Sequence, residues 1–439
     1  MRLRLLKIDE SRFTHDYNQV LIIVILNSLG FFFIGFWIPI VALGRMGANA
    51  FQVSLVSVSW FIGRLISGFI TGFIVDRIKS RTSLVLIGSF GRAIAYFIIY
   101  TAFITNEIFI LGIGYASLGI CAGIFWIPYN IIITEKSNKD HRSHAYGRRD
   151  SLNAVGQIIG SLFGFTLLMT AINFTDNPMV IYGAIPIYGA SNLLAGFLFY
   201  WKVDESIKFS NVDDNGQKNI IKKFGLQNNS INSFSLIIGI LLLLSLLFLG
   251  SINGNIARPF LNVYLVQNIL KLPLENLENS LLAVWAYLPA GLIATFLAPK
   301  LGILVDRVRP IIGITIISSL GALMTWLLIN APNLWMYSFF LLFDMAIGMS
   351  AGLLFANFYS RLSSKHRGKI FGTGDFFAFL GSIIGPILGG LVWDNVSHQL
   401  PFIISIFVEL SLIPLYITAV YLVLPHVEES YEFNRNKKN

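Results

Sequence analysis

Five ionisable side chains lie inside apolar stretches of the sequence, far from its polar loops. They are Arg64, Arg92, Arg258, Asp344 and Glu409. A charge near the centre of a lipid bilayer costs on the order of several kcal/mol unless it is paired or hydrated. Loss of hydration favours the neutral form of a carboxylic acid, so an acid at that depth can take up a proton and release it when water reaches it.

These residues support three interpretations. Asp344 and Glu409 are candidate proton-coupling groups, and Asp344 falls near the middle of its apolar stretch. Alternatively, the two acids form fixed bridges between helices with the three arginines. A third interpretation takes the arginines as anchors for an anionic solute, because a guanidinium group binds anions through paired hydrogen bonds.

Other polar and aromatic residues in the apolar stretches fit the lining of the same site. The run from Gly250 to Asn255 is the most informative, since glycine and asparagine loosen a membrane helix only where protein or water satisfies its backbone. The candidates, besides the three arginines, are Asn27, Trp126, Tyr129, Asn130, Ser251, Asn253, Asn255 and Phe355. Each also fits ordinary packing, and single Trp or Tyr residues are more often found in packing or at the lipid interface.

The elements that must position these residues are membrane helices. Of the 439 residues, 55% are hydrophobic and 13% are charged, whereas soluble domains carry roughly a quarter charged residues. Crossing a hydrocarbon core of about 30 Å takes roughly 20 residues of helix. Stretches of that kind cover residues 19–43, 51–75, 83–102, 108–134, 150–172 and 179–201, then 234–266, 281–305, 311–329, 334–362, 370–393 and 401–424.

Basic residues predict the orientation of these spans, because positively charged loops stay on the cytoplasmic side. They gather in alternate loops, at 2–12, 77–81, 136–149, 202–232, 300–309 and 361–369, and the opposite loops carry Arg45 and Lys271. We therefore expect a multi-pass protein of the cell membrane with both termini and the central loop in the cytoplasm.

Several other classes of protein are disfavoured by composition. Cys121 is the single cysteine, so the chain can form no internal disulfide and no cysteine-based metal site. The net charge of +9 is dispersed over short loops, which argues against nucleic acid as a partner. No GxxxxGK[ST] motif is present, which argues against ATP-driven pumping. We expect no cofactor.

The two halves of the chain repeat each other. The pattern GxxxDR occurs as Gly72, Asp76, Arg77 and again as Gly302, Asp306, Arg307, about half the chain apart. The segment 141–164 aligns with 366–389 without a gap, and this alignment pairs Asp150 with Asp375. Since both halves run in the same direction, they predict parallel repeats.

These features together resemble the major facilitator superfamily over essentially the whole chain. The resemblance implies an all-α membrane protein of twelve transmembrane helices in two pseudo-symmetric parallel six-helix bundles. We expect an N-terminal bundle at 1–201, a central cytoplasmic loop at 202–232, a C-terminal bundle at 233–427 and a tail at 428–439. The second Gly of the family's loop signature is replaced here by Lys79.

The resemblance also implies a cytoplasmic gate. It places the gate on Gly72, Asp76, Arg77, Arg81, Asp150, Gly302, Asp306, Arg307 and Asp375. In the gate, Asp76 would accept hydrogen bonds from the N-terminus of a neighbouring helix. Asp150 and Asp375 are candidate helix caps or partners, because they begin the fifth and eleventh apolar regions. The alternative is a charge cluster that serves only topology, which would not require an acid.

One further pattern resembles the twelve-helix drug/proton antiporters of the superfamily. Gly381 to Gly390 reproduces GxxxGPxxGG, but those exporters carry this pattern on the fifth helix and this chain carries it on the eleventh. Close helix packing accounts for the glycines equally well. Drug export therefore stays one of several options.

The sequence as a whole predicts a secondary transporter of a small organic solute that works by alternating access, with proton coupling through Asp344 or Glu409. Export of a drug or metabolite and uptake of an anionic solute both fit. We expect a monomer in the lipid bilayer that is not an enzyme. The alternatives are a membrane-embedded enzyme, such as a lipid transferase, and a receptor that does not transport. Clustered His or carboxylate residues suited to catalysis do not occur in the loops.

Overall fold

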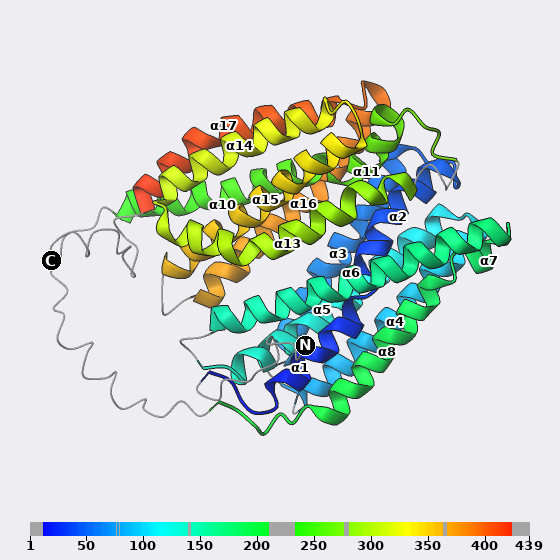
Figure 1. Ribbon diagram of the computed structural model, residues 1–439. Coiled ribbons are helices and arrows are strands. Elements are labelled where there is room, and N and C mark those ends of the chain that lie inside the picture. The colour runs from blue at the N-terminus through cyan, green and yellow to red at the C-terminus, as the bar shows by residue number, and fades with distance from the viewer. Residues whose placement is uncertain are drawn as a thin grey trace. The chain divides into compact units, whose positions relative to one another are not determined.

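The computed structural model of the protein describes residues 12–75, 77–78, 80–138, 142–209, 233–275, 281–362 and 367–423. In these parts the chain is helical and its connections are short (Figure 1). The single isolated β-bridge among them joins Phe13 to Ser137. A helical fold is expected at this hydropathy, because a helix satisfies its own backbone groups in lipid.

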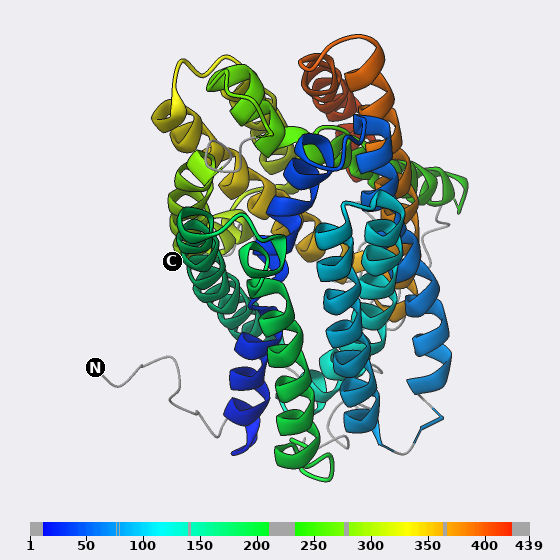
Figure 2. The same cartoon turned by 90° about the vertical axis from the view of Figure 1, so that its right-hand side faces the viewer.

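The first repeat contains eight helices, some of which form one span together. They are α1 (Tyr17–Ser28), α2 (Phe31–Gly44), α3 (Ala50–Val75), α4 (Arg81–Thr105), α5 (Ile108–Glu135), α6 (Arg142–Phe174), α7 (Pro178–Ile181) and α8 (Ala184–Lys202). Helix α1 runs beside α8 (Figure 2, blue and green). The first span is broken at Leu29 and Gly30, so the predicted stretch 19–43 is two helices.

The second repeat starts at Ser233 and contains the remaining helices. They are α10 (Ser233–Ile256), a 3-10 turn (Arg258–Phe260), α11 (Leu261–Tyr264), a π turn (Leu265–Ile269), α13 (Val284–Arg307), α14 (Pro310–Ile329), α15 (Leu334–Leu362), α16 (Arg367–Asn395) and α17 (Leu400–Val423). The predicted stretch 234–266 is therefore also broken, just before Pro259, which cannot donate to a helical hydrogen bond.

The prediction of membrane helices is confirmed. Ten helical segments of the described residues are long and apolar enough to span a membrane. Helices α8 and α13 occupy the predicted sixth and eighth spans and complete the order of twelve. Two helix starts differ: α6 begins at Arg142, eight residues before the predicted stretch, and α16 begins at Arg367, three residues before it. Asp150 and Asp375 therefore lie inside helices, and the prediction that they cap them is wrong, because polar helical turns precede the apolar ones.

The contacts between helices divide the chain into two compact units. Unit 1 comprises Met1–Ile34, Gly63–Ile104 and Ile113–Asn232, and unit 2 comprises Gly35–Ile62, Thr105–Gly112 and Ser233–Asn439. The division falls inside α2 and α3, so segments of both helices belong with the helices of the second repeat. The domain boundaries at 201 and 233 stay a prediction.

Each unit has its own apolar core. In unit 1 the core joins residues of α1, α5 and α8, with Tyr17, Tyr129 and Phe199 among its large side chains. In unit 2 it joins residues of α10, α14, α15 and α17, including Leu243, Leu354 and Tyr416. Many other large apolar side chains are exposed, as lipid-facing residues must be.

Glycines bring the first membrane span of each repeat against the fifth span, which is α6 in the first repeat and α16 in the second. A Cβ atom added to Gly160 on α6 would lie 1.9 Å from the carbonyl oxygen of Leu29, and one added to Gly389 on α16 would lie 1.9 Å from that of Ile256. Gly156 and Gly381 make similarly close approaches to α1 and α10. Gly156 and Gly381 are matched positions in the alignment of the two repeats, and both touch the first helix of their own repeat, as expected where small residues let membrane helices touch backbone to backbone.

We predict that Gly160→Ala lowers the thermal stability of the purified protein, because the new methyl group has no room beside Leu29. The expected cost is about 1–3 kcal/mol, the usual range for overpacking. Gly389→Ala should act in the same direction.

The matched control is Gly35→Ala on α2, where no atom lies within 4 Å of an added Cβ. Alanine is the better helix former by about 1 kcal/mol, so this variant should be at least as stable as the parent protein. Equal unfolding temperatures for Gly160→Ala and Gly35→Ala would contradict the prediction.

Candidate functional site

Arg92 is the most deeply buried charged residue of unit 1, with 0% of its surface exposed. Its guanidinium group lies 4.6 Å from the ring centre of Phe31 and 5.3 Å from that of Phe125. It donates hydrogen bonds to the side-chain oxygen of Asn27 and, at 3.0 Å, to the carbonyl oxygen of Asn27. Among the described residues it forms no ion pair with an acid. Amide oxygens and aromatic faces therefore surround this cation.

The bond to Asn27 lies at the break between α1 and α2. A break leaves carbonyl oxygens without helical donors, and at membrane depth these must find other partners. Arg92 of α4 supplies a donor for Asn27, and the Ser191 hydroxyl of α8 donates to Leu26 at 3.0 Å. The break is thus built into the unit, and Gly30 fits there against the ring of Tyr96.

Glu409 is the corresponding charged residue of unit 2, and it lies on α17. Its carboxylate accepts a hydrogen bond of 2.7 Å from the side-chain nitrogen of Asn253 on α10. The side chain of Ser318 on α14 is a second hydrogen-bond partner. Glu409 therefore links three helices, in a role comparable to that of Arg92 in unit 1.

Asp344 on α15 has a different environment. No hydrogen bond or ion pair within the described part of the chain holds its carboxylate, and Glu409 and Arg258 are close enough to interact with it electrostatically. Arg258 itself is exposed and begins the 3-10 turn after α10. The geometry thus separates the two acids: donors fix Glu409, and Asp344 has only long-range electrostatic partners.

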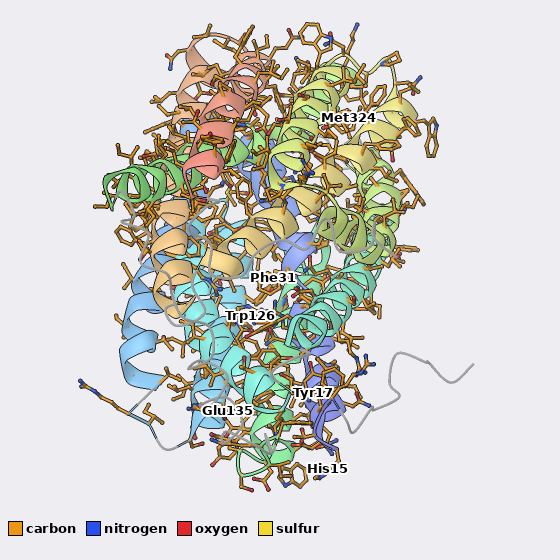
Figure 3. All side chains as sticks on the ribbon, turned by 90° about the vertical axis from the view of Figure 1, so that its left-hand side faces the viewer. His15, Tyr17, Phe31, Trp126, Glu135 and Met324 are labelled. Atoms are coloured by element: carbon orange, nitrogen blue, oxygen red, sulfur yellow. The ribbon has the colours of Figure 1, made fainter. Side chains whose placement is uncertain are left out.

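Three predicted site residues on α5 lie close together. The ring of Trp126 meets that of Tyr129 edge to face at 5.5 Å. The Tyr129 hydroxyl donates to the carbonyl oxygen of Val20 at 3.1 Å, which makes it a residue of the core. Asn130 accepts a hydrogen bond of 2.6 Å from Arg149, whose guanidinium group also lies 6.0 Å from the Trp126 ring centre. Figure 3 places Trp126 and Phe31 away from the end of unit 1 that carries Tyr17 and Glu135.

The remaining predicted residues have packing roles or partial exposure. Asn255 donates to the carbonyl oxygen of Ser251 at 2.8 Å and to the Ser382 hydroxyl at 3.1 Å. Phe355 packs against Tyr416 with ring centres 5.2 Å apart. Arg64 is half-buried on α3.

The predicted cytoplasmic gate is described only in part. Gly72 and Arg77 are exposed, and Arg81 forms an ion pair of 2.6 Å with Glu135 at the end of α5. Asp150 pairs with its neighbour Arg149 at 2.7 Å. Asp76 lies outside the described residues, as do the side chains of Asp306, Arg307 and Asp375 and the surroundings of Gly302.

A cluster of charged residues at this end of unit 1 escaped the sequence analysis. Lys136 and Asp16 form an ion pair in which both side chains are at most 5% exposed. Lys136 also donates to the carbonyl oxygens of Asp204 at 2.7 Å and Ile207 at 3.1 Å. The pair therefore ties the segment before α1 and the end of α5 to the residues that follow α8. No local sequence pattern predicts this cluster, because Asp16 precedes α1, Lys136 follows α5, and Asp204 and Ile207 follow α8.

Glu205, next to this cluster, caps α4. Its carboxylate accepts hydrogen bonds from the backbone N–H groups of Arg81 at 3.0 Å and Thr82 at 2.8 Å, and from the Thr82 and Ser80 hydroxyls. Burial favours a higher pKa for Glu205, but these hydrogen bonds outweigh it and hold the pKa of Glu205 below its usual range. The sequence VDES at 203–206, which contains Glu205, recurs as VEES at 427–430, and this repeat is a sequence signal that could have drawn attention to it.

We predict that Glu205→Gln lowers the stability of the protein by about 1 kcal/mol at pH 7, the scale of a helix cap. Because the pKa of Glu205 is lowered in the folded state, its stabilising contribution is present above the ordinary pKa of a glutamate. It is lost as the pH falls through the lowered value.

Thermal unfolding of parent and variant at pH 7 and near pH 4 measures this effect. The difference between the two should shrink at the lower pH. Glu275→Gln, which removes an exposed glutamate, should give no difference at either pH. A Glu205→Gln effect of equal size at both pH values would contradict the assignment.

Comparison with known proteins supports the fold and names the family. The family model described as "Major Facilitator Superfamily" matches residues 20–373. A search of curated proteins found no significant match.

Three similar solved structures share 13–14% sequence identity with this chain, so they show the fold alone. A bacterial homologue of the human lysosomal transporter Spinster is 14% identical with a TM-score of 0.67, over 94% of this chain and 98% of that chain. The nucleoside transporter NupG is 14% identical with a TM-score of 0.66, over 92% and 99%. A bacterial homologue of the human drug peptide transporters PepT1 and PepT2 is 13% identical with a TM-score of 0.65, over 95% and 98%.

The extent of the family match and the order of membrane helices lead to one conclusion. The chain is an integral membrane protein with twelve transmembrane helices in two parallel six-helix repeats, and it belongs to the Major Facilitator Superfamily of transporters.

Proposed function

We propose that the protein is a secondary transporter that moves a small organic solute by alternating access, with proton coupling through Asp344. The observation that carries the coupling is the environment of Asp344. It lies ten residues after the start of the 29-residue helix α15, which at about 1.5 Å per residue puts it deep in the membrane. No hydrogen bond among the described residues holds its carboxylate.

Glu409 is the second proton candidate, and its contacts favour a structural role. Asn253 and Ser318 both interact with its carboxylate, so a change of protonation there would disturb the junction of α10, α14 and α17. A buried acid that bridges helices is costly to alter, because its partners lose their acceptor. We therefore assign coupling to Asp344 and helix linkage to Glu409.

The arginines divide in a similar way. Arg92 is enclosed by Asn27, Phe31 and Phe125, which favours a structural role. Arg258 is exposed and interacts electrostatically with Asp344, so it is the better anchor for an anionic group of the solute. A titrating acid beside an arginine would let the proton and the solute influence each other's binding.

The solute class can be found with the purified protein. A library of small organic acids, nucleosides, peptides and cationic drugs would be screened by thermal shift, because a ligand that binds the folded state raises the unfolding temperature. Flux into proteoliposomes, with the pH gradient in either direction, then distinguishes import from export. A ligand that binds without flux would favour the receptor alternative, and conversion of the ligand would favour a membrane-embedded enzyme.

We predict that Asp344→Asn abolishes accumulation of the identified solute driven by a pH gradient and leaves exchange of labelled for unlabelled solute. Exchange needs no net proton movement, so it reports that the variant still binds and moves solute. The loss should be about tenfold or more. Gradient-driven accumulation at the parent rate in Asp344→Asn would exclude this acid as the coupling group.

We also propose a cytoplasmic gate at the GxxxDR loops, in which Asp76, Arg77 and Arg81 stabilise the closed cytoplasmic side. Asp306, Arg307, Asp150 and Asp375 are the related residues of the second loop and of α6 and α16. Both termini and the central connection lie on this cytoplasmic side in the proposal. Support comes from the ion pair of Arg81 with Glu135, which joins the start of α4 to the end of α5.

We predict that Asp76→Asn shifts the protein towards the state open to the cytoplasm. Cysteines introduced along α5 and α15 should then react faster with an impermeant maleimide added from the cytoplasmic side, and more slowly with one added from the other side. Asp150→Asn, which removes an exposed acid paired with its own neighbour, should have the smaller effect. Unchanged labelling on both sides would leave the loop with a topological role only.

A further inference from the structure

The N-terminus of α3 is capped from two sources. Its first source is local: the Asn49 side chain accepts from the backbone N–H of Gln52 at 2.9 Å, and the Gln52 side chain accepts from the N–H of Asn49 at 3.0 Å. This reciprocal arrangement is a capping box. It leaves the N–H groups of Ala50 and Phe51 without a local acceptor.

The second source is Asp394, in the last turn of α16. One carboxylate oxygen accepts from the N–H of Ala50 at 3.0 Å, and the other accepts from that of Phe51 at 2.8 Å. A carboxylate at a helix N-terminus also interacts favourably with the helix dipole. Asn49 and Asp394 together therefore satisfy the first three N–H groups of α3.

Close backbone contact supports this cap. A Cβ atom added to Gly390, one turn before Asp394, would lie 2.8 Å from the carbonyl oxygen of Ala50 and 2.4 Å from the Ser54 hydroxyl. Trp393 is 5% exposed and stacks on Phe260 at 4.8 Å, which fixes the end of α16. The carboxylate is thus held where the two helices touch.

The position of this cap in the repeats distinguishes it from an ordinary helix cap. Glu205 and the helix it caps, α4, both belong to the first repeat. Asp394 belongs to the second repeat, and α3 belongs to the first. The 26 residues of α3 extend about 39 Å, so the cap lies at the membrane face opposite the GxxxDR loop. From Gly63 onwards α3 belongs to unit 1.

We propose that Asp394 is a positioning residue of a second gate, at the membrane face opposite the GxxxDR loop. Its carboxylate joins α3 to α16 while that face is closed, and the two hydrogen bonds break when the face opens. Asp394 is exposed, so water can replace the N–H donors, and the bond can break and re-form in each cycle. The Asn49 capping box stays with α3 and keeps its N-terminus intact in the open state.

This inference rests on the proposed alternating access, and distances along α3 and α16 test it. In a Cys121→Ala background, spin labels would be placed at exposed positions near each end of the two helices. The pair at the Asp394 end is Leu55→Cys with Val396→Cys, and the pair at the other end is Ile74→Cys with Phe376→Cys. With the protein in lipid nanodiscs, double electron–electron resonance then measures the distribution of distances between the two spin labels of each pair.

Asp394→Asn should move population to longer distances at the Leu55–Val396 pair and to shorter distances at the Ile74–Phe376 pair. We expect a shift of roughly tenfold in the ratio of the two states, which corresponds to about 1.4 kcal/mol. Asp394→Glu keeps the charge and should lie between parent and Asp394→Asn. The matched control is Asp176→Asn, which removes an exposed acid between α6 and α7 and should match the parent at both ends.

Two results would overturn the inference. One is an unchanged distribution at both pairs in Asp394→Asn. The other is a longer distance at the Leu55–Val396 pair alone, since that would mean local fraying of a helix cap with no movement of the far end. A parent protein with one distance at each end under all pH and solute conditions would instead contradict alternating access itself.

Discussion

The constraint on which this structure depends is that every backbone polar group at membrane depth needs a partner inside the protein. Continuous helices meet it without help, but this chain breaks its first span at Leu29 and Gly30. Arg92 and Ser191 supply donors to the carbonyl oxygens there. This explains why the charged side chain of Arg92 is tolerated in the interior of unit 1. Arg92 donates to an oxygen that lipid could not satisfy, and aromatic rings pack against its guanidinium group.

In the second repeat, a buried acid, Glu409, holds the first helix, where the first repeat uses the cation Arg92. Glu409 accepts from Asn253 on the first helix of its repeat, as Arg92 donates to Asn27 on the first helix of the other. Glycines of the fifth helices press against the same first helices in both repeats. The halves therefore share an architecture in which a buried polar link and a glycine contact hold the first helix, although the linking residue differs in type and in position.

Carboxylates at helix N-termini recur at the ends of the spans. Glu205 accepts from the first N–H groups of α4, and Asp394 from those of α3. The chemistry is the same, but its consequence depends on connectivity. A cap between helices of one repeat stabilises that repeat, whereas a cap between helices of different repeats couples them and can take part in a conformational change.

Hydropathy, charge asymmetry and the internal repeat determined the membrane helices, their order and the family resemblance from sequence alone, since these are properties of composition and period. The sequence also identified Arg92, Asp344 and Glu409 as unusual, because an ionisable residue in an apolar stretch is visible without coordinates. Their partners were decided by the tertiary structure. Asn27 lies 65 positions from Arg92, and Asp394 lies 344 positions from Ala50, and only the packing of helices determines which distant groups meet.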